Sequence, residues 1–260
     1  MHNDGVMTYS MWQYSKGKDT IKFYLDFTDE EGIFKGKTVL DIGCGAGGKT
    51  MYYASLGVEK IYGVDILEKY RAEAEALAEE LGVNDKFNFV SGDASNLPFE
   101  DNSIDTIIMN DAMEHVDHPE AVLKECLRVL SPKGRLYLNF PPYYHPHGAH
   151  LSDAIGIPWV HMFFSEDTLV KVYKDGVSKL PDGEARVELR IATNQQGKEY
   201  FSYINGMTIK RFKRILRDMN IKPIYYKEIP LRSPLSLLAK APVTKEMFVK
   251  MAVCVIEKPK

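Results

Sequence analysis

The sequence has few cysteines, and they fit none of the usual cysteine-based frameworks. Only three are present among 260 residues, Cys44, Cys126 and Cys254, and no two have the Cys-x-x-Cys spacing. An odd number of scattered cysteines argues against a disulfide scaffold, a zinc cluster and a dithiol redox centre. We expect three reduced thiols, as in a cytoplasmic protein.

Long apolar runs are also lacking. The longest, Met251–Ile256, is far shorter than the roughly 20 residues that a membrane helix needs. The first residues contain no basic region followed by an apolar core, so they do not have the pattern of a secretory signal. These absences predict no membrane contact and a cytoplasmic location.

The composition is otherwise ordinary. The residues are 45% apolar, 27% charged and 11% aromatic, which is typical of a globular protein large enough for one α/β domain with additions. The net charge of −3 conceals an asymmetry, because residues 208–260 contain 13 Lys or Arg against 4 Asp or Glu. These charges are spread over expected helices and strands, which favours a solvated surface over a nucleic-acid interface.

Short apolar runs alternate with helical patterns from Lys37 onward. The expected strands are residues 39–42, 61–64, 87–90, 104–109 and 135–140, and the expected helices are residues 47–56, 68–81 and 119–130. Strands and helices of these lengths in alternation imply right-handed crossovers and a sheet covered on both faces. We therefore predict a doubly wound α/β fold with a mostly parallel, seven-stranded sheet.

The alternation stops after Phe140 and resumes near residue 208. In between we expect a helix at 165–174 and strands at 185–193 and 199–203; afterwards we expect a helix at 208–219 and strands at 224–227 and 248–256. The sequence thus predicts four segments: an N-terminal helical lid (1–36), a core (37–140), an inserted substrate-binding cap over the carboxyl edge of the sheet (141–206), and a C-terminal helix and strands that complete the sheet (207–260).

A glycine-rich loop joins the first expected strand to the first expected helix. Gly43, Gly45 and Gly48 satisfy the Gly-x-Gly-x-x-Gly pattern, and Asp65 lies 20 residues after Gly45, where a ribose-binding acid is expected. Glycines let a ligand approach the main chain, and the following helix N-terminus favours an anionic group. The loop indicates a nucleotide-like ligand but does not say which one.

Three further features narrow the choice of ligand. Asp41 precedes the first glycine, where a carboxylate would repel a pyrophosphate but can hold an ammonium group. Asp93 ends the third strand, where it can accept a hydrogen bond from an adenine amine. Lys49 alone follows in the loop as a cation that could neutralise phosphates. Together they favour a ligand with a ribose, an adenine and an amino-acid end.

The combination of spaced motifs resembles the class I S-adenosylmethionine-dependent methyltransferases of the group called methyltransferase type 11. The resemblance covers roughly residues 37–140 and rests on Val39 to Gly48, Asp65, Gly92-Asp93-Ala94 with Leu97-Pro98-Phe99, Asp105 to Val116, and Leu130 to Leu136. It implies a Rossmann-like methyltransferase fold, S-adenosylmethionine as cofactor and S-adenosylhomocysteine as product.

The resemblance also assigns roles to single residues. Those implied to bind the cofactor are Asp41, Gly43, Gly45 and Gly47 at the methionine part, Asp65 at the ribose hydroxyls, Ile66 at one adenine face, Asp93 and Ala94 at the adenine edge, and Asn110 beneath the sulfonium. Asp65 and Asp93 have an alternative reading as caps of the helices that follow them. Glu114 and His115 could belong to the floor of the site, but the resemblance implies that such a pair supports the backbone after the fourth strand.

Methyl transfer to a hydroxyl acceptor needs a group that removes a proton, and the cap is rich in histidine. His150 is the first candidate for this base and His161 the second, because imidazole titrates near neutral pH. His145, His147 and His150 have two alternative readings, as metal ligands or as an inert surface loop; we expect no metal.

Aromatic side chains are expected around the acceptor. They are Tyr143, Tyr144, Trp159, Phe163 and Phe164 in the cap, and Tyr9, Trp12 and Tyr14 in the lid. The favoured function is methyl transfer to oxygen, nitrogen or carbon of a small organic molecule. The alternatives are a methyltransferase for tRNA or another macromolecule, a non-catalytic cofactor-binding module, and a nicotinamide-dependent oxidoreductase.

Overall fold

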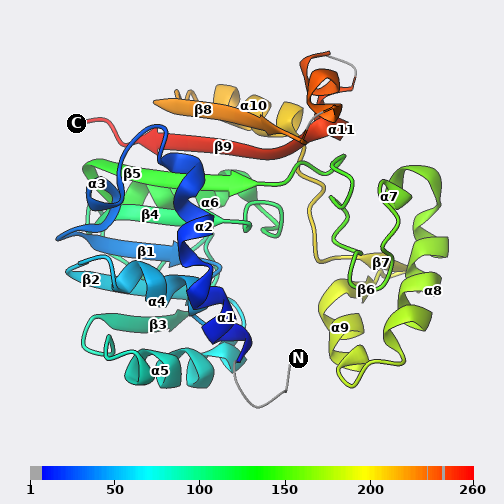
Figure 1. Cartoon of the computed structure of the whole chain (residues 1–260), viewed down its shortest axis with the longest axis horizontal. Coiled ribbons are helices and arrows are strands. Elements are labelled where there is room, and N and C mark those ends of the chain that lie inside the picture. The colour runs from blue at the N-terminus through cyan, green and yellow to red at the C-terminus, as the bar shows by residue number, and fades with distance from the viewer. Residues whose placement is uncertain (1–7, 233, 242–243) are drawn as a thin grey trace.

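The computed structural model describes residues 8–232, 234–241 and 244–260. Its centre is a seven-stranded sheet with the order β3-β2-β1-β4-β5-β9-β8 (Figure 1). The strands are β1 (Thr38–Ile42), β2 (Lys60–Asp65), β3 (Phe87–Ser91), β4 (Ile104–Asn110), β5 (Leu130–Phe140), β8 (Tyr225–Pro230) and β9 (Val249–Glu257). The first five are parallel, and β9 runs antiparallel to β5 and β8. This confirms the predicted doubly wound, mostly parallel seven-stranded sheet.

The sheet is apolar on both faces because helices cover both. Leu40 and Ile42 of β1 point into one core, whereas Val39 points into the other, as the twofold repeat of a strand requires. The first core lies under α6 (Pro119–Val129) and α10 (Ile209–Asp218). The second lies under α4 (Gly48–Ala54), α5 (Arg71–Glu80) and the N-terminal helices. Strands β1, β4 and β9 are therefore buried along nearly their whole length.

The N-terminal segment packs on the second face as a series of short helices. These are α1 (Tyr9–Ser15), α2 (Gly17–Ile21), η1 (Lys22–Tyr24) and α3 (Glu30–Phe34). Thr8 caps α1 by accepting a hydrogen bond from the backbone N–H of Met11 (3.2 Å). Close packing of α1 on α4 depends on Gly48, because a Cβ there would lie 2.2 Å from the carbonyl oxygen of Ser10. The last glycine of the loop motif thus serves helix packing.

Residues 141–206 form a lobe beside the carboxyl ends of β1, β4 and β5 (Figure 1). It contains α7 (Val160–Phe163), α8 (Glu166–Val177), α9 (Gly183–Arg190), β6 (Ile191–Thr193) and β7 (Glu199–Phe201). Buried side chains give the lobe a core of its own, made of Ala149, Leu151, Ile155, Val160, Leu169, Tyr173 and Val177. We call this lobe the cap.

The strand predicted at residues 185–193 is wrong over most of its length, because residues 183–190 form helix α9. Apolar and polar residues alternate there, which is the pattern of a strand. Arg186 and Arg190, four residues apart on one helix face, both reach the carboxylate of Asp153, at 2.9 and 3.3 Å. The ion pairs across the cap favour the helix over the local pattern.

The remaining elements follow the expected order. The helix predicted at 68–81 begins with a 3₁₀ turn, η2 (Glu68–Tyr70), before α5. A short 3₁₀ helix, η3 (Leu235–Lys240), and α11 (Lys245–Phe248) lie between β8 and β9. The three cysteines are buried free thiols. Among the helices of the described residues, none has the length and apolar character required to cross a bilayer.

Gly48→Ala is expected to destabilise the protein, because its Cβ would also lie 2.5 Å from the Cβ of Gln13 and would push α1 from α4. We expect a loss of about 1–3 kcal/mol in the free energy of unfolding, measured by urea denaturation. Gly156→Ala is the control, since a Cβ there meets no atom within 4 Å. Equal losses in the two variants would contradict this account of the packing.

Candidate functional site

A cavity of about 560 Å³ opens at the carboxyl ends of β1 to β4. Its walls come from the glycine loop, the ends of β2 and β3, the segment after β4, α1 and two stretches of the cap. Five acidic side chains line it: Asp65, Glu73, Asp93, Asp111 and Asp117. Among the described residues that line the cavity there is no Lys or Arg. Such a lining favours a cationic ligand over a diphosphate.

The glycine loop reaches the cavity through a backbone that only glycine adopts readily. Gly43, Gly45 and Gly47 have φ angles of 77°, 53° and 80°. The backbone N–H of Gly43 donates to the carbonyl of Val64 (2.8 Å), which fixes the loop to the end of β2. A Cβ on Gly45 would meet no atom within 4 Å, so its backbone faces open space. Gly47 does not line the cavity, because Ala74 and Met51 fill the space beside it.

Asp65 joins the two loops that form the floor of the cavity. Its carboxylate accepts hydrogen bonds from the backbone N–H of Gly45 (2.9 Å) and of Leu67 (2.9 Å). Each carboxylate oxygen has two lone pairs, so one on each oxygen stays available to a ligand in the cavity. This arrangement fits the two hydroxyls of a ribose.

The other end of this wall suits an adenine. Ile66 lines the cavity with 70% of its surface exposed, which leaves its apolar side chain free to cover a flat ring. Asp93 and Ala94 line the same end. Asp93 also accepts a hydrogen bond from the backbone N–H of Ser95 (2.8 Å), which stabilises the turn after β3. The same side chain lines the cavity. Residues 94–103, all described, contain no helix, so the alternative reading of Asp93 as a helix cap is wrong, while its contact with an adenine stays a prediction.

Asp41 lies beneath the glycine loop and does not line the cavity. It is buried and accepts a hydrogen bond from the hydroxyl of Thr50 (2.5 Å). Burial raises the pKa of Asp41 to about 7, although this hydrogen bond and the charge of Lys49 lower it. Lys49 in turn pairs with Asp111 (3.2 Å) at the rim of the cavity. Asp41 therefore contacts α4, the helix that follows the glycine loop, through Thr50.

Asn110 is buried under the site and does not line the cavity. Its side-chain oxygen accepts from the hydroxyl of Tyr24 (2.5 Å) and from the amide of Asn139 (2.6 Å). Its amide donates to the hydroxyl of Tyr53 (3.1 Å) and to the carbonyl of Thr20 (3.4 Å). All four hydrogen-bonding positions are thus used within the protein. Asn110 ties the N-terminal helices to the end of β4, and the next residue, Asp111, faces the cavity.

The cap contributes the wall opposite the adenine end. His115, which follows β4, lines the cavity together with Leu189, Ser202 and Tyr203 of the cap. The ring of Tyr203 lies 4.3 Å from that of His115, and the Tyr203 carbonyl is 2.7 Å from His115 Nδ1. Burial lowers the pKa of the His115 imidazole. Sequence reasoning missed this wall, because its members are about 90 residues apart.

The two histidines predicted as the base occupy different places. His150 lies behind His115, with ring centres 4.9 Å apart, and does not itself line the cavity. Burial lowers its pKa to about 4. His161 packs against Tyr143 (4.9 Å between ring centres), also away from the cavity. The structure groups His150 with Glu114 and His115, and not with His145 and His147.

Only one of the aromatic residues predicted in the lid and the cap lines the cavity. Tyr9 and Gln13 of α1 line the cavity, and Tyr9 stacks on Trp12 at 5.8 Å. Tyr14 packs on Tyr52 of α4. None of the five cap aromatics predicted to surround the acceptor lines this cavity. Tyr203 and Tyr70 line it instead.

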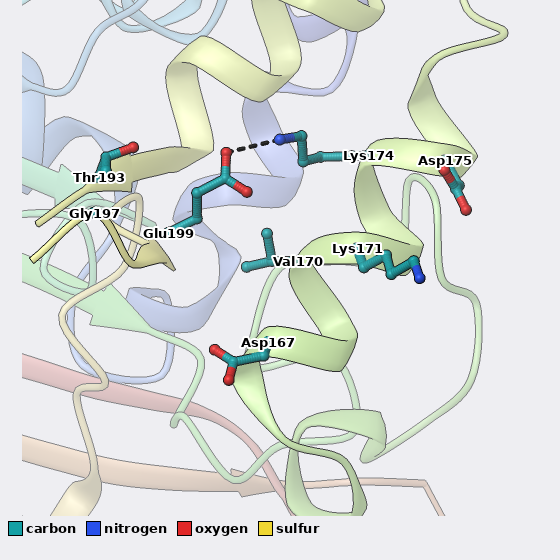
Figure 2. Close-up of a pocket in the computed structure, with 8 residues that line it drawn as sticks. All are labelled: Asp167, Val170, Lys171, Lys174, Asp175, Thr193, Gly197 and Glu199. Atoms are coloured by element: carbon teal, nitrogen blue, oxygen red, sulfur yellow. Dashed lines mark hydrogen bonds and ion pairs between the residues drawn. The ribbon is translucent and has the colours of Figure 1, made fainter.

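A second hollow of about 570 Å³ lies on the cap, between α8 and the β6–β7 hairpin (Figure 2). Lys174 reaches across it to Glu199 (2.7 Å), while Lys171 and Asp175 point outward. Asp167 at its edge pairs with Lys198 at 3.1 Å. The glycine loop, whose backbone lines the first cavity, does not line this hollow.

Comparison with known proteins places this geometry in a family. Residues 40–138 match the family model described as a methyltransferase domain. Residues 40–138 therefore correspond to a methyltransferase domain of the type 11 group. This domain implies S-adenosylmethionine as the cofactor, and the acidic cavity with Asp65 at its floor fits that cationic nucleoside.

Relatives with curated functions match only this domain. Sterol 24-C-methyltransferase of Pneumocystis carinii is 37% identical over 42% of this chain and 29% of its own length. Probable tocopherol O-methyltransferase of Oryza sativa is 34% identical over 40% of this chain and 29% of its length. Norajmaline N-methyltransferase of Rauvolfia serpentina is 34% identical over 38% of this chain and 34% of its length. The matches thus span about a third of each relative.

Solved structures match nearly the whole chain at low sequence identity. An S-adenosylmethionine-dependent methyltransferase from Methanosarcina mazei has a TM-score of 0.53 at 22% identity, over 92% of this chain and 97% of that one. The [4+2]-cyclase SpnF has a TM-score of 0.60 at 17% identity, over 99% of this chain and 86% of that one. Likenesses at this identity show a shared fold.

Asp65→Asn is expected to weaken binding of S-adenosylhomocysteine by tenfold or more, because it removes a charged acceptor worth about 1.5–3 kcal/mol. The comparison is made by titration calorimetry. Asp85→Asn, on an exposed turn before β3, is the control and is expected to bind as the parent does. Unchanged affinity in Asp65→Asn would contradict the ribose assignment.

Asp41 gives the ligand-free protein a defined pH dependence. Its pKa of about 7 in the folded chain exceeds the value near 3.9 of an unfolded Asp, so the folded state holds its proton more tightly. The contribution of Asp41 to the free energy of unfolding is therefore complete below about pH 4 and is lost as the pH rises to about 7. Asp41→Asn is expected to be the more stable protein at pH 7.5 by roughly 2–4 kcal/mol, and to lose that advantage near pH 4. Urea denaturation at both pH values tests this; a difference that does not vary with pH contradicts it.

Proposed function

We propose that this protein transfers the methyl group of S-adenosylmethionine to a small organic acceptor. The observation that carries the proposal is the cavity of the methyltransferase domain, which five acids line without a Lys or Arg among the described lining residues. A ligand that carries a sulfonium and an ammonium group gains from that lining, whereas a dinucleotide would need its two phosphates neutralised.

The acceptor lies at the cap end of the cavity. The ribose and adenine positions at Asp65 and Ile66 leave the opposite wall, His115 with Ser202 and Tyr203, for the second substrate. Leu189, Ser202 and Tyr203 of the cap line this end, so one lobe of the same chain forms the wall beside the acceptor. Relatives named for a sterol, tocopherol and norajmaline act on carbon, oxygen and nitrogen, and they support a small acceptor without choosing its atom.

The reaction is an in-line displacement. A lone pair of the acceptor forms a bond to the methyl carbon, while the carbon–sulfur bond breaks and its electron pair stays on sulfur. The cofactor supplies both the methyl group and the leaving group, so the chain aligns the partners and excludes water. A hydroxyl acceptor also loses a proton. We propose that this activation takes place at the wall of His115 and His150, and not at His161.

A macromolecular acceptor has less support from the arrangement of charges. Basic residues of α10 and the segment after it are partly neutralised inside the protein: Lys213 and Lys245 both pair with Glu228. Helix α10 covers the first core beneath β5, β9 and β8, at the side of the sheet remote from the adenine end of the cavity (Figure 1).

Methyl transfer is tested by measuring S-adenosylhomocysteine formed with a panel of hydroxyl, amine and carbon acceptors of sterol, phenol and alkaloid size. His150→Ala is expected to lower kcat about 100-fold, a typical loss for a group that assists proton removal. His161→Ala is the matched control, because that imidazole packs on Tyr143, whereas His150 packs on His115 of the cavity wall. Transfer to RNA but to no small acceptor, or equal rates in the two variants, contradicts the proposal.

A further inference from the structure

Glu114 is the most unusual polar residue beside the cavity. It is 3% exposed, and neither of its carboxylate oxygens has a hydrogen-bond partner among the described residues. Burial of a carboxyl group without a partner is costly, and buried acids are normally paired, hydrogen-bonded or bound to a metal. The methyl transfer described above makes no use of this side chain.

Two imidazole nitrogens converge on the same carboxylate. Nε2 of His150 lies 3.7 Å from Glu114 Oε1, and Nε2 of His115 lies 3.8 Å from the same oxygen. Both distances are too long for hydrogen bonds. The three ligand atoms all lie within 4.8 Å of one another. Nitrogen and oxygen ligands about 2.1 Å from a tetrahedral ion lie about 3.4 Å from each other, so each histidine would approach Glu114 by a few tenths of an ångström and the two imidazoles would also move together to share one ion.

A hydrogen bond to its other ring nitrogen orients Nε2 of His115 as a ligand. The Tyr203 carbonyl can only accept, so His115 Nδ1 at 2.7 Å carries the proton and Nε2 keeps its lone pair. A backbone carbonyl on the second nitrogen is the usual support of a metal-bound histidine. His150 is held in a left-handed backbone conformation (φ 54°), and Arg190 donates to its carbonyl oxygen. Such strain at a non-glycine residue is typical of functional positions.

We propose that Glu114, His115 and His150 bind one divalent transition-metal ion. Two imidazoles and a carboxylate form the ligand set of non-haem iron and catalytic zinc sites, whereas Mg²⁺ and Ca²⁺ prefer oxygen ligands. Three protein ligands leave coordination positions open. His115 lines the cavity, so these positions face the end that the proposed function gives to the acceptor.

The role of the ion, unlike its binding, rests on the proposed function. A hydroxyl or carboxylate of the acceptor would occupy an open position on the ion. Coordination lowers the pKa of a hydroxyl strongly, so its proton is lost at neutral pH and the oxygen becomes the nucleophile. His150 then contributes as a ligand, and its replacement lowers kcat as expected above.

Metal content decides the proposal. Tag-free full-length protein is treated with a chelator, loaded with Co²⁺ or Zn²⁺, desalted and analysed by mass spectrometry of the metals. We expect one ion per chain and visible absorption bands from Co²⁺. His147→Ala removes a neighbouring cap histidine outside the cluster and is expected to keep the ion. Glu114→Gln and His150→Ala are expected to lose it.

Two controls keep the outcomes distinct. Circular dichroism establishes that each variant is folded, and if a variant is not folded, the parent protein decides alone: its melting temperature should rise on addition of Co²⁺ after chelation. Less than a tenth of an ion per chain in the parent, or full occupancy in folded Glu114→Gln, overturns the proposal. Calorimetry with S-adenosylhomocysteine on the chelated parent tests the cofactor site separately, so a missing metal and a missing cofactor site give different results.

Discussion

The double hydrogen bond of Asp65 is the interaction on which the site depends. One oxygen holds the N–H of Gly45 and the other holds that of Leu67, so the loop after β1 and the loop after β2 are fixed to one carboxylate. The glycine loop is also held at the end of β2, where the backbone N–H groups of Gly43 and Cys44 donate to the carbonyl of Val64 (2.8 and 3.2 Å). The acid that we predict to bind the ribose thus also shapes the floor of the cavity.

A second constraint comes from polar side chains buried beneath that floor. Asn110 and Asn139 end β4 and β5, and they satisfy each other together with Tyr24 and Tyr53. In a medium of low dielectric constant such a network is rigid only when every member is satisfied. It attaches the N-terminal helices to the sheet edge, which places α1, and Tyr9 with it, over the cavity.

The sheet and the cofactor end could be predicted from the sequence because their signals are local. Apolar runs mark the buried strands, and glycines and acids at fixed spacing mark the loops after β1, β2 and β3. The acceptor end had no such signal: His115, His150 and Tyr203 are brought together by folding of the cap, and Glu114 was read as a backbone support. Asn110 was assigned to the ligand because its position follows a motif, yet its hydrogen bonds go to residues of the N-terminal helices. Helix α9 was missed because its apolar residues alternate, and long-range ion pairs with Asp153 decided its form.

The central claim is that the acid-lined cavity is the site of a cationic nucleoside. Its most direct test is a crystal structure of the protein grown with S-adenosylhomocysteine. We predict density in this cavity with the ribose hydroxyls on Asp65, the adenine beside Ile66, and the sulfur directed to the wall of His115. An empty cavity, or a ligand held elsewhere by Lys and Arg side chains, would contradict the account.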